Sequence, residues 1–226
     1  MRSLSRPIVL SLLLAASGVA YGAGSGEMPR QMGGTPQATP EEQALSIYNA
    51  GVRVVERADK LAADAARQSD ARHRDKALGK AQAGYASALR KFTRATELDP
   101  SMHQAWNYLG YTNRKLGRYD AALAAYDRAL ALKPGYPEAI EYRGHAYFGL
   151  NRLSEAKEAY LTLFGGQRAL AAQLLEAMRS WVSAHRGDPA GIDAASLDAF
   201  ATWVSERSAI ASQTAGLTRD GVSAAW

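Results

Sequence analysis

Apolar residues recur at intervals of three and four from about residue 40 to residue 213, and almost no stretch alternates with a period of two. This spacing places apolar side chains along one face of an α-helix. The sequence therefore predicts an all-α domain. Its start is marked by Thr39, Pro40 and Glu42, because Thr39 can accept from an early backbone N–H and Glu42 can complete a capping box.

The helical region repeats itself at an offset of 34 residues. Small residues in the repeated positions would let two antiparallel helices approach closely, and a repeated proline would end the second helix because it has no N–H to donate. One hairpin cannot bury its apolar face alone, so we expect the hairpins to stack. The aligned sets are Ala88, Ala122 and Ala156; Phe92, Tyr126 and Tyr160; Tyr85, Tyr119 and Leu153; and the pairs Gly110 and Gly144, Ala95 and Ala129, Leu98 and Leu132, Pro100 and Pro134.

The segment before the repeats departs from this spacing. Gly51, at the end of the apolar segment 44–51, takes the place of Gly110, yet Ala88 follows it by 37 residues where Ala122 follows Gly110 by 12. We therefore expect two unusually long helices that turn near residues 68–73. The predicted organisation is a long hairpin at 40–100, regular hairpins at 101–134 and 135–166, C-terminal capping helices at 167–213, and a loose tail at 214–226.

The C-terminal helices admit two interpretations. They can cap the end of the stack, because the last repeat needs a helix whose outer face is polar. Alternatively, Trp181 and Trp203 can supply an added docking surface.

The best-preserved repeat resembles a known family. Residues 105–134 are closely similar to the tetratricopeptide repeat, although Asn113 stands where an aromatic residue is usual. The next unit keeps Gly144, Tyr147, Ala156 and Tyr160, with Ile140 in place of the tryptophan. The resemblance implies a short right-handed solenoid of antiparallel helix hairpins. The signature positions are Trp106, Leu109, Gly110, Tyr119, Ala122, Tyr126, Ala129 and Pro134.

The same resemblance implies a binding site for a protein or peptide. In this family the first helices form the concave surface, where basic, acidic and aromatic side chains can meet an extended or helical segment. The family pattern that clamps a terminal carboxylate is not carried over, because Glu138 and Tyr142 occupy two of its basic positions. The matching groove residues are Gln104, Asn107, Tyr111, Arg114, Lys115, Glu138, Glu141, His145 and Phe148.

The N-terminus has the pattern of a secretory signal. Arg2 and Arg6 precede an apolar run at 8–16 and a small-residue stretch at 17–23, and the run is shorter than the ~18 residues that a membrane span needs. We expect a signal peptide at 1–22, cleaved between Ala20 and Ala23, and a flexible linker at 23–39. Because the chain has no cysteine, a lipoprotein is not expected, and the mature protein should be periplasmic or secreted, without a membrane span.

Charge and candidate chemistry argue against other function classes. The net charge is +5, and about +3 once Arg2 and Arg6 are removed, with both signs interspersed, so nucleic-acid binding is not expected. The four histidines lie in different elements, no serine sits in a glycine-flanked elbow, and no glycine-rich phosphate loop occurs. No catalytic residue, metal or cofactor is therefore predicted.

These observations predict an exported adaptor that holds a protein segment, in cell-envelope assembly or maturation. The alternative is a self-associating component of an envelope complex. An enzyme with an atypical site is the remote alternative.

Overall fold

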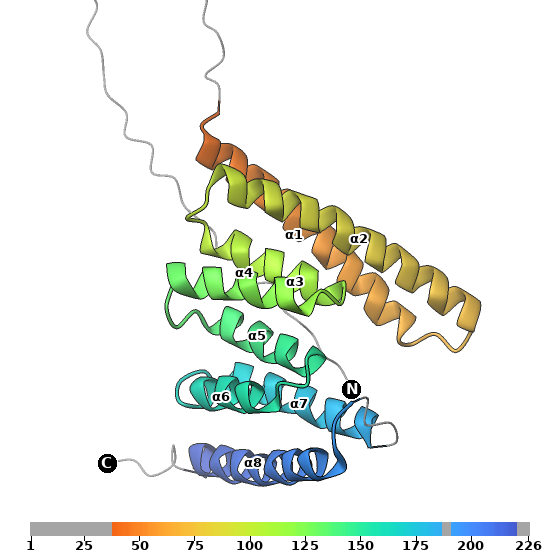
Figure 1. Ribbon diagram of the computed structural model, residues 1–226, viewed down its shortest axis with the longest axis vertical. Coiled ribbons are helices and arrows are strands. Elements are labelled where there is room, and N and C mark those ends of the chain that lie inside the picture. The colour runs from red at the N-terminus through yellow and green to blue at the C-terminus, as the bar shows by residue number, and fades with distance from the viewer. Residues whose placement is uncertain (1–37, 187–190, 221–226) are drawn as a thin grey trace, which may run out of the picture. The chain divides into compact units, whose positions relative to one another are not determined.

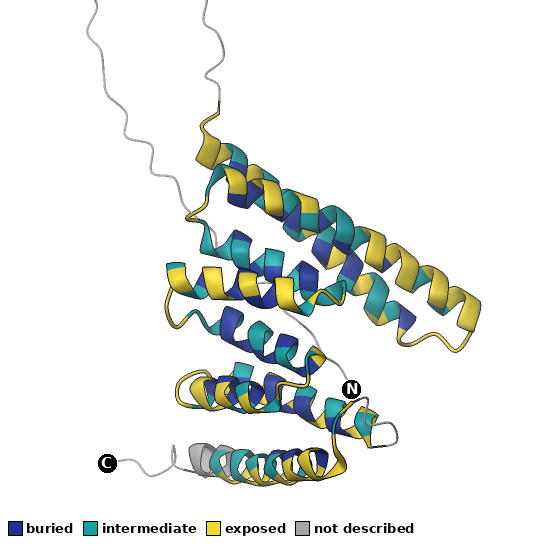
Figure 2. Cartoon of the chain, viewed as in Figure 1, coloured by how far each residue is buried: buried dark blue, intermediate teal, exposed yellow. Residues whose placement is uncertain are grey.

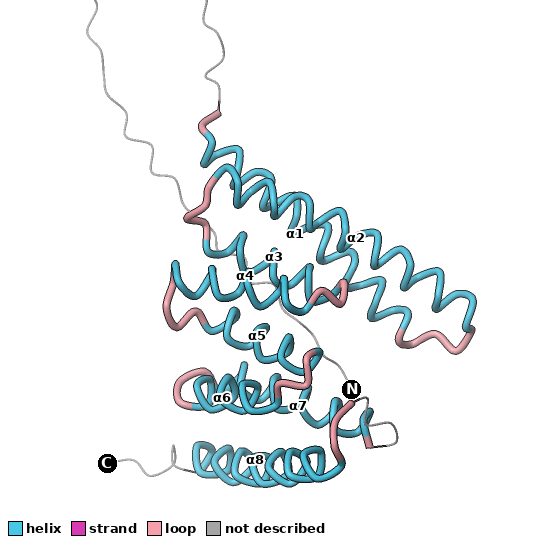
Figure 3. The backbone as a smooth tube through the Cα atoms, viewed as in Figure 1, coloured by secondary structure: helices cyan, strands magenta, loops and turns pink. Residues whose placement is uncertain are grey.

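The computed structural model describes the backbone of residues 38–186 and 191–220, with side chains described up to residue 214. These residues form α-helices joined by loops, and the described chain contains no strand (Figure 3). The predicted signal peptide and nearly all of the linker lie outside the described residues. The helices are α1 (Pro40–Ala65), α2 (Ala71–Leu98), α3 (His103–Lys115), α4 (Tyr119–Leu132), α5 (Pro137–Gly149), α6 (Leu153–Phe164), α7 (Arg168–His185) and α8 (Ala194–Asp220).

Helix α1 begins where the sequence places it. The Thr39 hydroxyl accepts from the Glu42 backbone N–H at 3.2 Å, and the Glu42 carboxylate accepts from the Thr39 backbone N–H at 2.9 Å. Pro40 occupies the first helical position. The predicted capping box is confirmed.

The helices are stacked as hairpins (Figure 1). Each helix contacts the next one along the chain, and α1 also contacts α3, α3 contacts α5, and α5 contacts α7. The first helices of the hairpins therefore form one continuous layer, and α2, α4 and α6 lie outside it. This is the all-α, tetratricopeptide-type solenoid that the sequence predicts.

The first hairpin is much longer than the others. Helices α1 and α2 have 26 and 28 residues, against 13 and 14 in α3 and α4, and the chain turns between them at residues 66–70. Its inner part packs against α3 through Phe92 and Tyr85. No residue from 66 to 80 is buried, and this end of the hairpin projects beyond α3 (Figure 2).

The repeated positions form the core of the stack. All six residues of the two aromatic and alanine columns are at most 1% exposed: Ala88, Ala122, Ala156, Phe92, Tyr126 and Tyr160. The helices cross closely at glycine, since a Cβ on Gly110 would lie 2.5 Å from Tyr126 Cε1 and a Cβ on Gly51 would lie 2.7 Å from Phe92 Cε1. Gly51 thus has the role that the sequence predicts for it.

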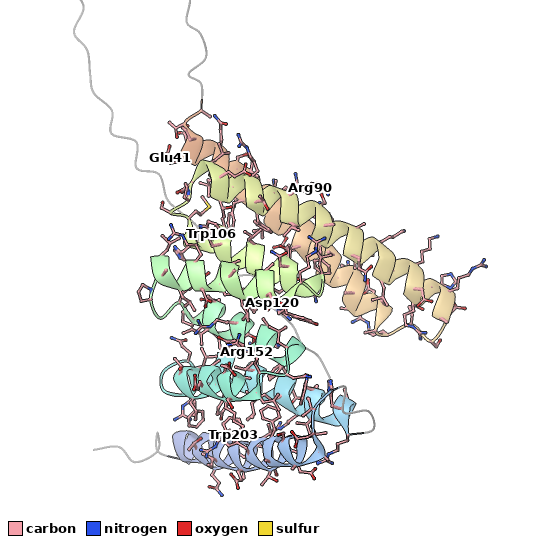
Figure 4. The ribbon with its side chains drawn as sticks, viewed as in Figure 1. Glu41, Arg90, Trp106, Asp120, Arg152 and Trp203 are labelled. Atoms are coloured by element: carbon pink, nitrogen blue, oxygen red, sulfur yellow. The ribbon has the colours of Figure 1, made fainter. Side chains whose placement is uncertain are left out.

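The C-terminal helices close the far end of the stack. Phe200 of α8 is 1% exposed and packs edge-on against Trp181 of α7, and Trp203 packs edge-on against Tyr160 of α6. Both tryptophans are partly buried and pack against the core that α8 covers, which supports the capping interpretation; Figure 4 shows Trp203 on α8. Helix α8 continues to Asp220 and includes part of the segment 214–226 that is expected above to be loose.

Candidate functional site

The predicted groove residues lie on two helices that the fold places side by side. Five come from α3 and four from α5, and these helices are in contact although α4 separates them in the sequence. Tyr111 meets Tyr142 across this contact with ring centroids 5.1 Å apart. The nine predicted residues therefore lie on two adjacent helices.

The end of this surface next to α1 is organised around a carboxylate. Asp59 of α1 accepts hydrogen bonds from the hydroxyls of Tyr85 at 2.6 Å and Tyr111 at 2.7 Å, and Lys115 Nζ lies 3.6 Å from the same oxygen. Burial raises the pKa of both tyrosines, and the Asp59 charge raises it further. Tyr111 and Lys115 therefore connect α3 to the long hairpin instead of facing a ligand freely.

Lys115 is held in a partly desolvated position. Burial lowers the pKa of its ammonium group, and Asp59 opposes that change. The ammonium group also lies 5.2 Å from the centre of the Tyr85 ring. Each of these contacts orders Lys115 against the first hairpin.

Arg114 lies in the middle of the surface between two rings. Its guanidinium carbon is 5.1 Å from the centre of the Tyr111 ring and 5.7 Å from that of Tyr142. Its Nε is buried without a hydrogen-bond partner, and Arg114 makes no ion pair with any residue that the structure describes. The guanidinium thus lies between two rings and close to the buried Tyr126 hydroxyl, and its Nε donor has no partner.

Glu141 and His145 form a pair one helical turn apart on α5. The Glu141 side chain is 6% exposed, and its Oε1 lies 2.8 Å from His145 Nε2. Burial lowers the pKa of His145, and this effect outweighs the opposing hydrogen bond from Glu141. The ring is therefore neutral at pH 7, and Nε2 donates to the carboxylate, which can only accept.

A cavity of about 390 Å³ opens beside this pair, where α3, α5 and α7 end. Phe148 is stacked on Trp181 at a centroid distance of 6.1 Å, and Trp181 is stacked on His185 at 4.0 Å. Arg114 and His145 line the polar side of the same cavity. Charged, hydrogen-bonding and aromatic groups therefore converge at one place.

The other predicted groove residues differ in how far they are exposed and in how close they lie to the cavity. Asn107, Glu141 and Phe148 are only 2%, 4% and 6% exposed, and of these three Phe148 lines the cavity. Gln104 and Glu138 are partly exposed near the start of α3 and α5, away from the cavity. The structure thus brings Arg114, His145 and Phe148 together and leaves Gln104 and Glu138 apart.

Several residues at this site were not found from the sequence. Asp59 and Tyr85 come from the long hairpin, and Trp181 and His185 come from α7, where the 34-residue period has stopped. Tyr85 belongs to the column of Tyr119 and Leu153, but no column of the repeat points to Asp59, Trp181 or His185. Trp181 was noticed, although as part of a different surface.

The described residues give no sign of a metal site or a membrane span. No three His, Cys, Asp or Glu residues of this part of the chain are grouped so that they could hold an ion. Within the same part, no helix is both long and apolar enough to cross a bilayer.

Comparison with known proteins identifies the repeat. Residues 80–137, which run from α2 to the start of α5, match the family model described as Tetratricopeptide repeat. This segment contains a tetratricopeptide repeat. The matched segment includes Gly110 and Tyr126, the glycine and the aromatic residue that meet where α3 and α4 cross closely. A search of curated protein sequences gave no match.

Solved structures with similar folds include two further proteins with tetratricopeptide repeats. The second such domain of human RPAP3, in complex with an HSP70 peptide, is 21% identical, covers 61% of this chain and 95% of its own, and has a TM-score of 0.45. The first domain of Spaghetti (RPAP3), bound to an HSP90 peptide, is 19% identical, covers 68% of this chain and 94% of its own, and has a TM-score of 0.36. At these values neither likeness transfers a ligand to this repeat protein.

Proposed function

We propose that this tetratricopeptide repeat protein is an adaptor that binds a segment of another protein along the surface formed by α3, α5 and α7. The observation that supports this most directly is the cavity at the end of those helices, lined by Arg114, His145, Phe148 and Trp181. A cavity with a few convergent polar groups and aromatic walls is the usual form of a recognition site. The partly exposed Gln104 and Glu138 extend the surface toward the other end of the helices.

The site suits binding better than catalysis. Glu141 is already hydrogen-bonded to His145, and among the described residues neither side chain is hydrogen-bonded to a serine, threonine or lysine. The aromatic groups that surround Arg114 orient it without neutralising it. Such a group supplies a fixed charge for recognition.

We further propose that the adaptor is exported and acts in cell-envelope assembly or maturation. The support is the N-terminal pattern of Arg2 and Arg6, an apolar run and small residues, followed by a chain without cysteine. N-terminal sequencing of the protein recovered from the periplasm or medium tests this. A new N-terminus between Ala20 and Ala23 is expected, and an intact Met1 in the cytoplasm would contradict it.

Site-specific photo-crosslinking tests the groove. A crosslinking amino acid placed at Glu138, on the groove face of α5, is expected to trap a protein partner in the native host. The same group at Arg90, an exposed position on α2 that Figure 4 labels, serves as the control. The proposal fails if adducts form equally at the two positions, or at Arg90 alone.

A further inference from the structure

We propose that the outer face of α2 is a basic surface that holds the protein against an anionic lipid membrane. This inference goes beyond the proposed adaptor function and uses none of the groove residues. The face is called the basic stripe below, and it consists of Arg72, Lys76, Lys80, Arg90, Lys91 and Arg94.

The first argument is the distribution of charge between α2 and the rest of the chain. Helix α2 carries seven lysines and arginines against two acidic residues, which is a net charge of +5. Of the 27 basic and 22 acidic residues of the chain, 20 of each lie outside α2. The net charge of the protein therefore lies entirely on one helix, although both signs are interspersed along the sequence as a whole.

The second argument is that the cations of α2 share one face. At 3.6 residues per turn, the six residues of the stripe fall within about 100° of the helix circumference and extend over about 33 Å of its length. Five of them are exposed, and Lys91 is partly exposed. The stripe faces away from the helices on which α2 packs, because the buried residues of α2 lie on its opposite side and include Ala81, Tyr85, Ala88, Phe92 and Ala95.

The third argument is that most of this charge is not neutralised within the protein. Among the residues that the structure describes, Arg94 alone of the stripe forms an ion pair, with Glu97 at 3.0 Å. The other acidic residue of α2, Asp75, lies outside the stripe and is 3.8 Å from Arg74. Like charges four residues apart destabilise a helix, so an anionic surface would relieve the repulsion along the stripe.

The composition of the stripe favours a lipid surface over a protein partner. Between the cations the same face holds Ala83 and Ser87, and no large apolar side chain lies on it from residue 72 to residue 94. A specific protein interface gains much of its affinity from apolar and aromatic side chains buried at its centre. A layer of anionic headgroups requires only charge, and each Lys or Arg near it adds to the attraction. A straight row of cations also meets a plane along its whole length.

The place of α2 in the fold leaves the stripe accessible. The helix lies outside the layer of first helices, and the end that carries Arg72, Lys76 and Lys80 projects beyond α3 (Figure 2). None of the six residues lines the cavity where α3, α5 and α7 end. A membrane and a segment bound in the groove would therefore contact different helices of the protein.

Vesicle sedimentation tests the lipid assignment on the protein as its native host processes it. Vesicles of phosphatidylcholine with about 30% phosphatidylglycerol are compared with vesicles of phosphatidylcholine alone. We expect the anionic vesicles to bind the protein at least about a hundredfold more tightly, because several cations act together. This preference should disappear at about 0.5 M salt, which screens exposed charges. Equal binding to the two kinds of vesicle at low salt would overturn the proposal.

A triple variant assigns the binding to the stripe. Arg72→Gln, Lys76→Gln and Lys80→Gln together remove three cations at positions that are not buried, so the fold should persist, and circular dichroism checks this. We expect the affinity for the anionic vesicles to fall about a hundredfold. Because the two kinds of vesicle are also compared on the wild-type protein, the proposal can fail whether or not the variant folds.

The matched control removes the same charge from the neighbouring outer helix. Arg118→Gln, Arg128→Gln and Lys133→Gln change three exposed cations of α4 and its two ends, and should weaken the binding by less than about threefold, because screening confines the attraction to groups near the membrane. Equal losses in the two triple variants would show that net charge alone matters and would overturn the assignment. Tighter binding to polyglutamate than to anionic vesicles of equal total charge would assign the stripe to an acidic protein and would also overturn it.

Discussion

The close crossing of α3 and α4 makes Gly110→Ala a sharp test of the fold. A Cβ at Gly110 would lie 2.5 Å from Tyr126 Cε1 and 2.6 Å from Cδ1, about 1 Å inside ordinary contact, and Tyr126 is fully buried. Overpacking a core in this way costs ~1–3 kcal/mol, while alanine in a helix interior gains back ~1 kcal/mol over glycine. We expect a net loss of up to about 2 kcal/mol and a melting temperature lower by up to about 8 °C.

Gly79→Ala is the matched control. Gly79 also lies inside a helix, α2, but a Cβ there would meet no atom within 4 Å. The same substitution should therefore stabilise the protein by ~0.5–1 kcal/mol. Urea and thermal unfolding followed by circular dichroism measure both variants, and the two changes should have opposite signs.

The double variant Gly110→Ala/Tyr126→Leu assigns the cause. If the tyrosine ring is what obstructs the new methyl group, the double variant loses less stability than the sum of the two single variants. Additive losses, or a Gly110→Ala protein as stable as Gly79→Ala, would refute the steric reasoning.

Two further predictions concern charged groups. Asp59→Asn should lower the free energy of unfolding by ~1–3 kcal/mol, because Lys115 loses its counter-ion and two tyrosine hydroxyls lose a charged acceptor. As a control, Asp64→Asn at an exposed ion pair should change it by less than ~0.5 kcal/mol. The midpoints of urea unfolding compare the two variants. Because burial lowers the pKa of His145 in the folded state, the unfolded chain takes up a proton at this residue at a higher pH than the folded chain does. The contribution of His145 to the free energy of unfolding is therefore complete above about pH 6.5 and is lost as the pH decreases below it. His145→Gln should flatten this dependence in unfolding curves between about pH 7.5 and about pH 5, and an unchanged slope would show that His145 does not titrate differently in the two states.

The 34-residue period accounts for most of what could be predicted. It located the helix crossings, since residues such as Gly110 and Tyr126 recur in a fixed column and meet in the structure. It also predicted which side chains of α3 and α5 line a groove, and that assignment stays a prediction. The spacing from Gly51 to Ala88 was enough to indicate that the first hairpin is long.

Several contacts at the candidate site do not follow the 34-residue period. Asp59 and Tyr111 are 52 residues apart in the sequence, and no pattern around either residue predicts their hydrogen bond. Glu141 was predicted to face the groove, yet it is buried and hydrogen-bonded to His145. Trp181 and His185 reach the cavity through a helix that has no counterpart in the repeat.

The projecting end of the long hairpin can change in length. No residue from 66 to 80 is buried. The first 15 Å or so of α2 and the adjoining part of α1 therefore pack mainly against each other. Removing whole turns from both helices together would keep their mutual register and leave the Tyr85 and Asp59 contacts in place. The hairpin is thus a part whose reach can be lengthened or shortened independently of the groove that its base helps to build.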